Sequence, residues 1–191
     1  MVSPFRPPSA RFAYLAHCLL NANAKVGEGA LCAGIFSPLV TRLRENGWTI
    51  RQMPCPELAF AGLRRFWAVR EQYDTPAYRA HCARLARAVA GQLEADLRNG
   101  GEALIVGVDG SPSMGVHLTA SAETWGGRPA VATSKDYPVV PGAGLFTEQL
   151  LAEMRARGVR HVRAIGIAQD APDYDERREL TRLDQILGET A

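Results

Sequence analysis

The stretch Ala103-Leu-Ile-Val-Gly-Val-Asp-Gly-Ser-Pro-Ser-Met-Gly115 decides the fold of this chain. Residues 103–108 are apolar without alternation, which favours a strand covered on both faces, as in a parallel sheet. Residues 109–115 change abruptly to small, polar and turn-forming types, where glycines permit a sharp bend and Pro112 cannot continue a hydrogen-bonded ladder. We therefore expect a buried central strand that ends in a polar loop.

Two interpretations of this loop are open. Ligands of open α/β sheets usually bind in the crevice beyond the carboxyl ends of the strands, which makes Ser111, Ser113 and the neighbouring backbone amides candidates for function. The same composition also suits an ordinary turn between a strand and a helix, with serines that cap the helix. Asp109 adjoins the serines and is the loop carboxylate that we keep as a functional candidate.

Short apolar runs and helical patterns alternate along the rest of the chain. We expect strands over residues 12–20, 48–53, 129–133 and 161–167, and helices over residues 37–46, 76–99, 145–157 and 174–187. Ser37-Pro38 and Thr75-Pro76 each combine an N-cap residue with a first-turn proline. This order predicts a single α/β domain over residues 1–191, with an irregular amino end at 1–10 and a Rossmann-like, mostly parallel sheet covered by helices on both faces.

The composition excludes several classes of partner. The chain has 191 residues, 47% of them hydrophobic, and a formal net charge of +2. Because its arginines are interspersed with carboxylates, no basic stripe for nucleic acid is present. Its apolar runs are shorter than the ~20 residues of a membrane span, and residues 1–8 lack the apolar core of a secretory signal. We expect a cytoplasmic protein with a small-molecule partner.

Four cysteines are enough for two disulfides, but in a cytosolic chain of this size we expect reduced thiols. Cys82 falls on the apolar face of the 76–99 helix and is expected in the core. Cys18 lies near the end of the first expected strand, and Cys55 follows the second between two prolines, which hold it in extended or turn geometry. A parallel sheet would bring both to the same edge as Ser111.

Three segments match one family in order along the chain. They are Cys18-Leu-Leu20, Cys55-Pro-Glu57 and Gly110-Ser-Pro-Ser-Met-Gly115, and they resemble the CLL, CPE and SPSCG motifs of the DUF523 family of thiouracil desulfurases and related desulfidases. The resemblance extends over nearly the whole chain. Further matches, Gly62-Leu63-Arg64, Tyr73-Asp-Thr-Pro76 and Pro141-Gly-Ala-Gly-Leu-Phe146, are most similar to the larger desulfurase-related branch.

This resemblance implies an iron–sulfur enzyme. In such desulfurases three cysteines hold a [4Fe–4S] cluster with one open iron, which takes the sulfur of a thiocarbonyl substrate while water replaces it at carbon. By position, Cys18 and Cys55 would be metal ligands. Glu57, Ser111 and Ser113 would lie nearby as catalytic residues that orient water or move protons.

At the third ligand position the chain has Met114, whose neutral thioether is a much poorer ligand than a thiolate. Cys32 is one possible replacement. A cluster held by two cysteines and solvent, or a smaller metal bound with His17 or His117, is a second alternative. Loss of the cluster with retention of the pocket is the third. Two functions follow: an iron–sulfur desulfidase for a small thiolated compound such as a thiobase, or a cluster-free small-molecule binding protein.

Overall fold

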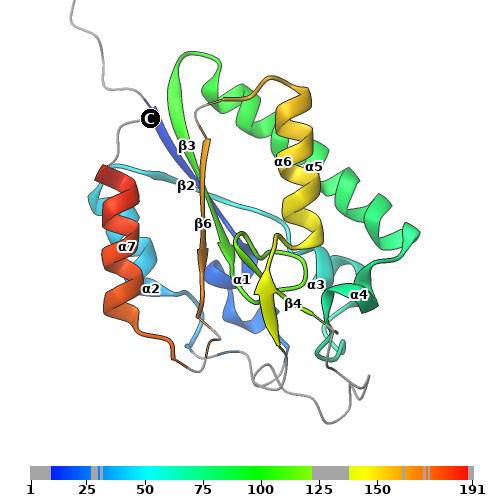
Figure 1. The fold of residues 1–191 in the computed structure, drawn as a ribbon. Coiled ribbons are helices and arrows are strands. Elements are labelled where there is room, and N and C mark those ends of the chain that lie inside the picture. Colours follow the sequence, from blue (N-terminus) through cyan, green and yellow to red (C-terminus); the bar gives the residue numbers. More distant parts are fainter. Residues whose placement is uncertain are drawn as a thin grey trace, which may run out of the picture.

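The computed structural model describes residues 10–26, 30, 32–121, 138–160, 162–169, 171 and 173–188. A four-stranded parallel sheet forms the centre, with the order β2-β1-β3-β6. Its strands are β1 (Ala10–Leu15), β2 (Thr49–Gln52), β3 (Gly101–Val108) and β6 (Val162–Ile167). Leu104, Ile105 and Val106 of β3 are buried, which confirms the expected central strand (Figure 1).

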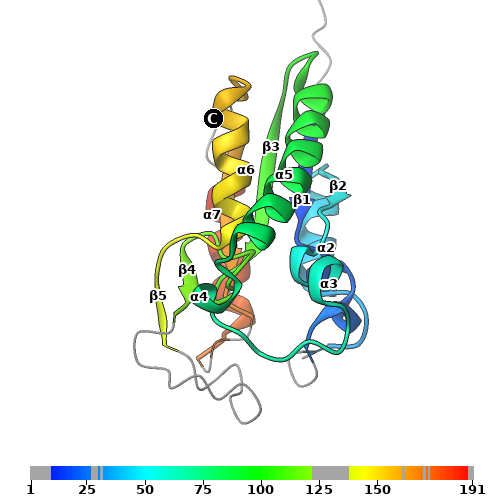
Figure 2. The same ribbon diagram turned by 90° about the vertical axis from the view of Figure 1, so that its right-hand side faces the viewer.

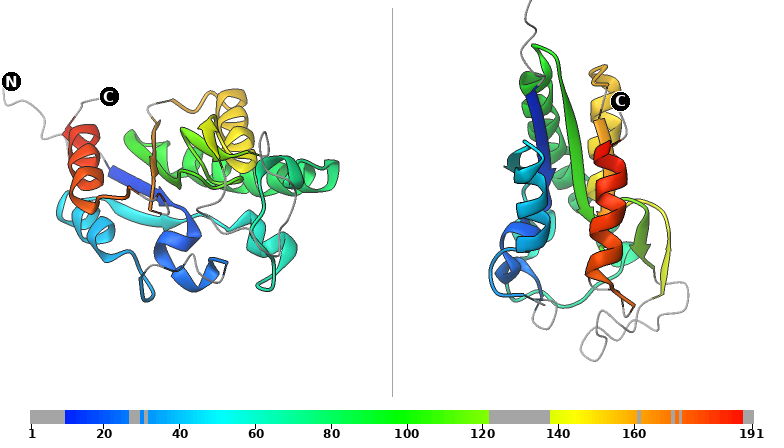
Figure 3. Two further views of the ribbon diagram at one scale, coloured as in Figure 1. Left: turned by 60° about the horizontal axis from the view of Figure 1, so that its bottom comes forward. Right: turned by 90° about the vertical axis from the view of Figure 1, so that its left-hand side faces the viewer.

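Helices cover both faces of this sheet. Helices α2 (Ser37–Glu45) and α7 (Glu176–Gly188) lie on one side, and α5 (Pro76–Leu97) and α6 (Leu145–Ala156) lie on the other. Figure 3 shows the same layers from two further directions. The structure confirms the expected single α/β domain with a parallel sheet between helices. Cys82 is buried in α5, as its place on the apolar face predicted.

Shorter elements gather at the carboxyl ends of the strands (Figure 2). They are α1 (His17–Leu20), the 3-10 helix η1 (Ala22–Ala24), α3 (Pro56–Ala61), α4 (Arg70–Tyr73) and a two-stranded antiparallel sheet of β4 (Leu118–Ala120) and β5 (Val139–Pro141). The sequence analysis did not predict these helices or this second sheet. Each is short, so its local pattern is weak compared with that of the longer helices.

The expected strand over residues 12–20 was wrong in its second half. Strand β1 ends at Leu15, the Ala16 N–H donates to Val106 O at 2.8 Å, and the chain then turns into α1, where the Asn21 N–H donates to His17 O at 2.8 Å. The apolar run continues past the strand because α1 buries Leu19. Cys18 therefore lies on a helical turn after the strand.

The two proline-based caps differ. Thr75 Oγ1 accepts a hydrogen bond from the Tyr78 N–H at 3.2 Å and caps α5 as predicted. Ser37 was wrongly expected to cap α2, because the helix begins one residue earlier, with Phe36 at the N-cap and no side-chain cap.

Residues 129–133, where a strand was expected, and His161, the first residue of another expected strand, lie outside the described residues. No helix in the described part of the chain is long and apolar enough to cross a membrane.

Candidate functional site

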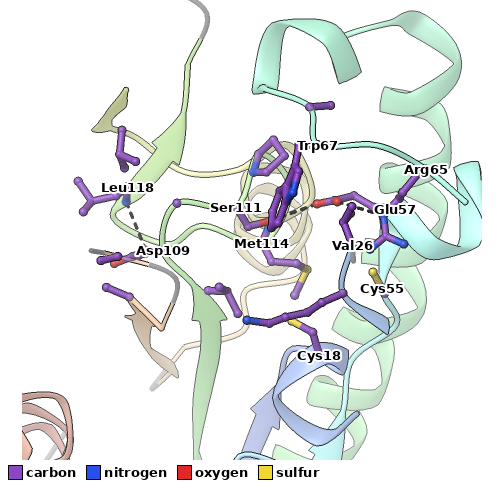
Figure 4. Close-up of a pocket in the computed structure, with 18 of the residues that line it drawn as sticks. Cys18, Val26, Cys55, Glu57, Arg65, Trp67, Asp109, Ser111, Met114 and Leu118 are labelled. Atoms are coloured by element: carbon purple, nitrogen blue, oxygen red, sulfur yellow. Dashed lines mark hydrogen bonds and ion pairs between the residues drawn. The ribbon is translucent and has the colours of Figure 1, made fainter. Parts of the chain in front are cut away.

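A cavity of about 310 Å³ lies at the carboxyl edge of the sheet (Figure 4). Its wall combines sulfur, polar and apolar side chains from segments far apart in the sequence: Cys18, Lys25, Val26, Cys55, Glu57, Arg65, Phe66, Trp67, Ala68, Val108, Asp109, Gly110, Ser111, Pro112, Met114, Leu118, Val139, Ala168, Ala171 and Asp173. A volume of a few hundred Å³ suits a small organic molecule.

Asp109 organises the loop that follows β3. Its Oδ1 accepts hydrogen bonds from the N–H groups of Val116 and His117, both at 2.9 Å, and of Leu118 at 3.3 Å. The side chain is buried, and buried carboxylates are tolerated where such donors satisfy them. The carboxylate therefore closes the loop over residues 109–118, and it also borders the cavity.

Glycines bring this loop close to its surroundings. Gly107 of β3 and Gly166 of β6 are register partners. A Cβ at Gly107 would lie 2.2 Å from Met114 O, and one at Gly166 would lie 1.9 Å from Asp109 Oδ1. A Cβ at Gly144 would lie 2.3 Å from the carbonyl carbon of Ser113. The loop thus rests on positions where no side chain fits.

The loop also caps α6, but through its carbonyl groups. Pro112 O accepts from the Leu145 N–H at 3.0 Å, and Ser113 O accepts from the Phe146 N–H at 3.1 Å. The serine hydroxyls are used elsewhere, so the interpretation in which they cap the following helix is wrong. Ser111 lines the cavity, and its role as a functional residue stays a prediction.

Ser111, Glu57 and Arg65 form one connected polar group. Ser111 Oγ donates to Glu57 Oε1 at 3.3 Å and accepts from the N–H groups of Ser113 at 3.2 Å and Met114 at 2.9 Å. Arg65 Nε lies 3.5 Å from Glu57 Oε2, and Arg65 Nη2 donates to Ala24 O at 2.6 Å. The nearly buried guanidinium therefore places its positive charge beside the carboxylate, as an ion pair without a hydrogen bond from Nε.

Cys55 and Cys18 reach the cavity from separate elements. Cys55 is the N-cap of α3, and its Sγ accepts a hydrogen bond from the Leu58 N–H at 3.3 Å. Burial raises the pKa of the Cys55 thiol above its ordinary value, and the nearby Glu57 charge raises it further. Cys18 is half-buried on α1. Figure 4 shows both sulfur atoms on the wall of the cavity.

Met114 lines the cavity, whereas Ser113 does not. The Met114 side chain is buried, and its sulfur lies in Figure 4 on the same cavity as the two cysteine sulfurs. Ser113 is fully buried, with its Oγ 2.6 Å from Tyr78 Oη of α5. The structure brings Glu57 and Ser111 together and places Ser113 at a contact with the helix layer.

The alternative ligands considered from the sequence lie elsewhere. Cys32 is half-buried, and Gln169 Nε2 lies 3.9 Å from its Sγ. His17 precedes Cys18 on α1, with its Nε2 3.5 Å from Asn21 Nδ2, and burial lowers its pKa. His117 is exposed. Within the described residues, none of these three side chains lines the cavity.

Sequence reasoning missed Lys25, Arg65, Phe66 and Trp67 as cavity residues. Lys25 Nζ donates to Gln169 Oε1 at 2.9 Å, which links η1 to the segment after β6. The run from Arg65 to Trp67 lies between two short helices, where no periodic pattern marks a buried face. The sequence signal that could have marked these cavity residues is an arginine followed by two aromatic residues, directly after Gly62-Leu-Arg64.

The fold and the site define an α/β domain with a cavity of small-molecule size at the carboxyl edge of its parallel sheet. No family model matches the chain. Uncharacterized protein MJ0003 of Methanocaldococcus jannaschii is 30% identical to it over 106 residues, which are 56% of this chain and 68% of that protein. The chain belongs to the same family as MJ0003.

A solved structure is also similar to this chain. The [4Fe–4S]-dependent thiouracil desulfidase TudS, a DUF523 protein, has a TM-score of 0.47 and 19% identity to this chain. The superposition covers 90% of this chain and 97% of that chain.

The donors present do not fit a [4Fe–4S] cluster held by three cysteinates. Of the described residues, the cavity has only two thiols, Cys18 and Cys55, while Cys32 and Cys82 lie elsewhere. The third sulfur is the Met114 thioether, which carries no charge to offset that of a cubane. No group of three His, Cys, Asp or Glu side chains in the described part of the chain is arranged to hold a metal ion.

Proposed function

We propose that this protein removes sulfur from a small thiocarbonyl compound, such as a thiolated heterocycle, as a divergent relative of the DUF523 desulfidases. The observation that carries the proposal is one cavity in which two thiols and the Glu57–Ser111 pair face a largely apolar wall. A thiocarbonyl is softer and less strongly hydrated than a carbonyl, so sulfur and apolar side chains suit it. The overall reaction is hydrolytic: the thiocarbonyl and water give the carbonyl compound and hydrogen sulfide.

The residues of this chain supply the proton transfers. Glu57 accepts a proton from water as the oxygen attacks the thiocarbonyl carbon, and Arg65 keeps the carboxylate in place. The sulfur takes the negative charge and receives the proton held by Glu57. Glu57 then accepts the proton of the new hydroxyl group as the carbonyl forms and the carbon–sulfur bond breaks, and it passes this second proton to the leaving hydrosulfide, which gives hydrogen sulfide. Ser111, bonded to Glu57 Oε1, orients this exchange. Trp67 and Phe66 contribute aromatic surface for a planar ligand.

Sulfide release from purified protein tests this proposal. Thiouracil and other thiocarbonyl heterocycles are incubated anaerobically with the protein as purified and after iron–sulfur reconstitution, with iron and acid-labile sulfide measured in both. We expect equal amounts of sulfide and the oxygen analogue, and loss of both products in Glu57→Gln. The matched control is Cys32→Ser, because the Cys32 side chain lies away from the cavity. No product from either preparation would contradict the proposal.

Met114 favours a second candidate, a cluster-free protein that binds a small molecule without turnover. Here Ser111, Glu57 and the backbone amides of the loop would be the polar contacts. Calorimetry with the same heterocycles separates the two candidates. Binding without product formation, weakened by Ser111→Ala, would select the binding protein.

A further inference from the structure

Three sulfur atoms face the cavity, each from a different element. Cys18 comes from α1, Cys55 from the N-cap of α3, and Met114 from the loop after β3. Figure 4 shows their sulfur atoms around the same part of the cavity. We propose that these side chains form a site for one soft monovalent metal ion, Cu(I). The inference rests on this set of donors and does not need the reaction proposed above.

Ligand chemistry selects this ion. Thiolates and thioethers are soft donors, and a set made of cysteine and methionine suits Cu(I). On binding, Cys18 and Cys55 each lose a proton to the solvent, and the neutral Met114 sulfur needs to lose none. Two thiolates and one Cu(I) leave a single negative charge. Arg65 and Lys25, which line the same cavity, are cations of the opposite sign.

The same cavity wall offers few of the nitrogen and oxygen ligands that harder metal ions prefer. Among the described residues no histidine lines the cavity. Glu57 is engaged by Ser111 and Arg65, and Asp109 Oδ1 accepts three backbone N–H groups. The third carboxylate on the wall, that of Asp173, is 77% exposed and paired with Arg178. Zinc sites usually complete a set of four ligands with sulfur, imidazole or carboxylate. The cavity therefore offers three soft donors and few nitrogen or oxygen donors.

The backbone fixes two of these donors. Met114 donates its N–H to Ser111 Oγ at 2.9 Å and accepts at its carbonyl from the Val108 N–H at 3.0 Å. Cys55 is fixed by its bond from the Leu58 N–H. Because the Met114 side chain is also buried, little ordering of these two side chains is needed when the ion binds.

Anaerobic titration with Cu(I) against the chromogenic chelator bicinchoninate measures stoichiometry and affinity. We expect about one Cu(I) per chain that competes with the chelator, and loss of this binding in Cys18→Ser and Cys55→Ser. Met114→Leu keeps an apolar side chain of similar size but removes the sulfur. It should weaken binding on the order of tenfold or more. The controls are Met154→Leu in α6 and Cys32→Ser, which are both away from the cavity and should leave the affinity unchanged.

Two results would overturn the inference: no competing Cu(I) in the wild-type protein, or unchanged affinity in a folded Met114→Leu variant, with folding checked by circular dichroism. The results also distinguish a failure of the proposed desulfidase function from a failure of the Cu(I) inference. Cu(I) binding without sulfide release would reject only the desulfidase proposal, and sulfide release from protein that binds no Cu(I) would reject only this inference.

Discussion

Ser111 Oγ donates a hydrogen bond to Glu57 Oε1 at 3.3 Å, which joins the loop after β3 to α3 across 54 residues of sequence. The serine also accepts two backbone N–H groups of its own loop. One hydroxyl therefore links the internal order of the loop to the position of the carboxylate in the cavity.

Ser111→Ala should lower the stability of the loop and remove the hydrogen bond to Glu57. The change leaves the N–H groups of Ser113 and Met114 without their acceptor, and we expect a loss of about 2 kcal/mol in the free energy of unfolding. Urea denaturation measures this loss. Ser37→Ala is the control, because Ser37 is exposed and makes only a 3.4 Å contact with Ile35 O. Equal stability of the two variants would contradict the role given to the hydroxyl.

The reactivity of Cys55 reports the charge of Glu57. Because burial and then the Glu57 charge raise the pKa of this thiol, Glu57→Gln should lower that pKa and increase the thiolate fraction near pH 8. The measurement is the rate of alkylation by iodoacetamide at Cys55, read by mass spectrometry of the peptides. Cys82, where burial raises the pKa to about 12, is the internal control and should stay unreactive. A slower rate in Glu57→Gln would contradict the assigned contact.

Asp109→Ala should destabilise the whole domain more than a surface substitution does. It removes the acceptor of three backbone N–H groups beside a buried strand, so we expect a loss of about 3 kcal/mol in the free energy of unfolding. Chemical denaturation tests this expectation. The matched control is Asp173→Ala, which also borders the cavity but has a side chain that is 77% exposed. A loss no larger than that of the control would show that the loop does not depend on the carboxylate.

Asp96 on α5 should make stability depend on pH in acid. Burial alone would raise its pKa, but hydrogen bonds from Arg51, Tyr14 and Gln92 lower it below its ordinary value of 3.8. A depressed carboxyl pKa stabilises the fold above the unfolded-state pKa, and this contribution is lost as the pH falls through the folded-state pKa.

Asp96→Asn should therefore be less stable than the wild type at neutral pH, by about 2 kcal/mol. The difference should narrow as the pH falls below about 4 and should close once the wild-type carboxylate is protonated. Thermal unfolding over a series of pH values measures this convergence. A stability difference between the variant and the wild type that stays constant at all pH values would contradict this explanation.

Met114→Cys should create the thiolate set that the wild-type chain lacks. Since three thiols would then face one cavity, we expect about four irons per chain after anaerobic reconstitution, with a broad visible absorption band. Met114→Leu is the control and should retain little iron. If the cysteine variant also binds none, residue 114 does not occupy a ligand position.

The long elements could be predicted from the sequence because their patterns are local. The unalternating run of β3 and the threefold and fourfold spacing in α5 each depend on a few neighbouring residues, and the structure has both elements. The strand expected through Cys18 was wrong because an apolar run does not distinguish a strand from the buried turn of α1 that follows it.

The site was predictable only in part. The motif segments led to Cys18, Cys55, Glu57 and Ser111, which line one cavity. Arg65 could not be selected in advance from its neighbour Arg64, because its position depends on contacts with Ala24 O and Glu57 that span distant segments. Ser113 has the same residue type as Ser111, but the turn directs it to Tyr78.

The loop after β3 lies close to Gly107, Gly144 and Gly166. Its path therefore depends little on which side chain residue 114 carries. These contacts hold the loop largely by its main chain, so a donor atom at residue 114 can be exchanged while the path of the chain is preserved. The fold therefore tolerates single substitutions at residue 114, and it offers protein engineers a position at which the donor atom that faces the cavity can be changed without redesigning the fold.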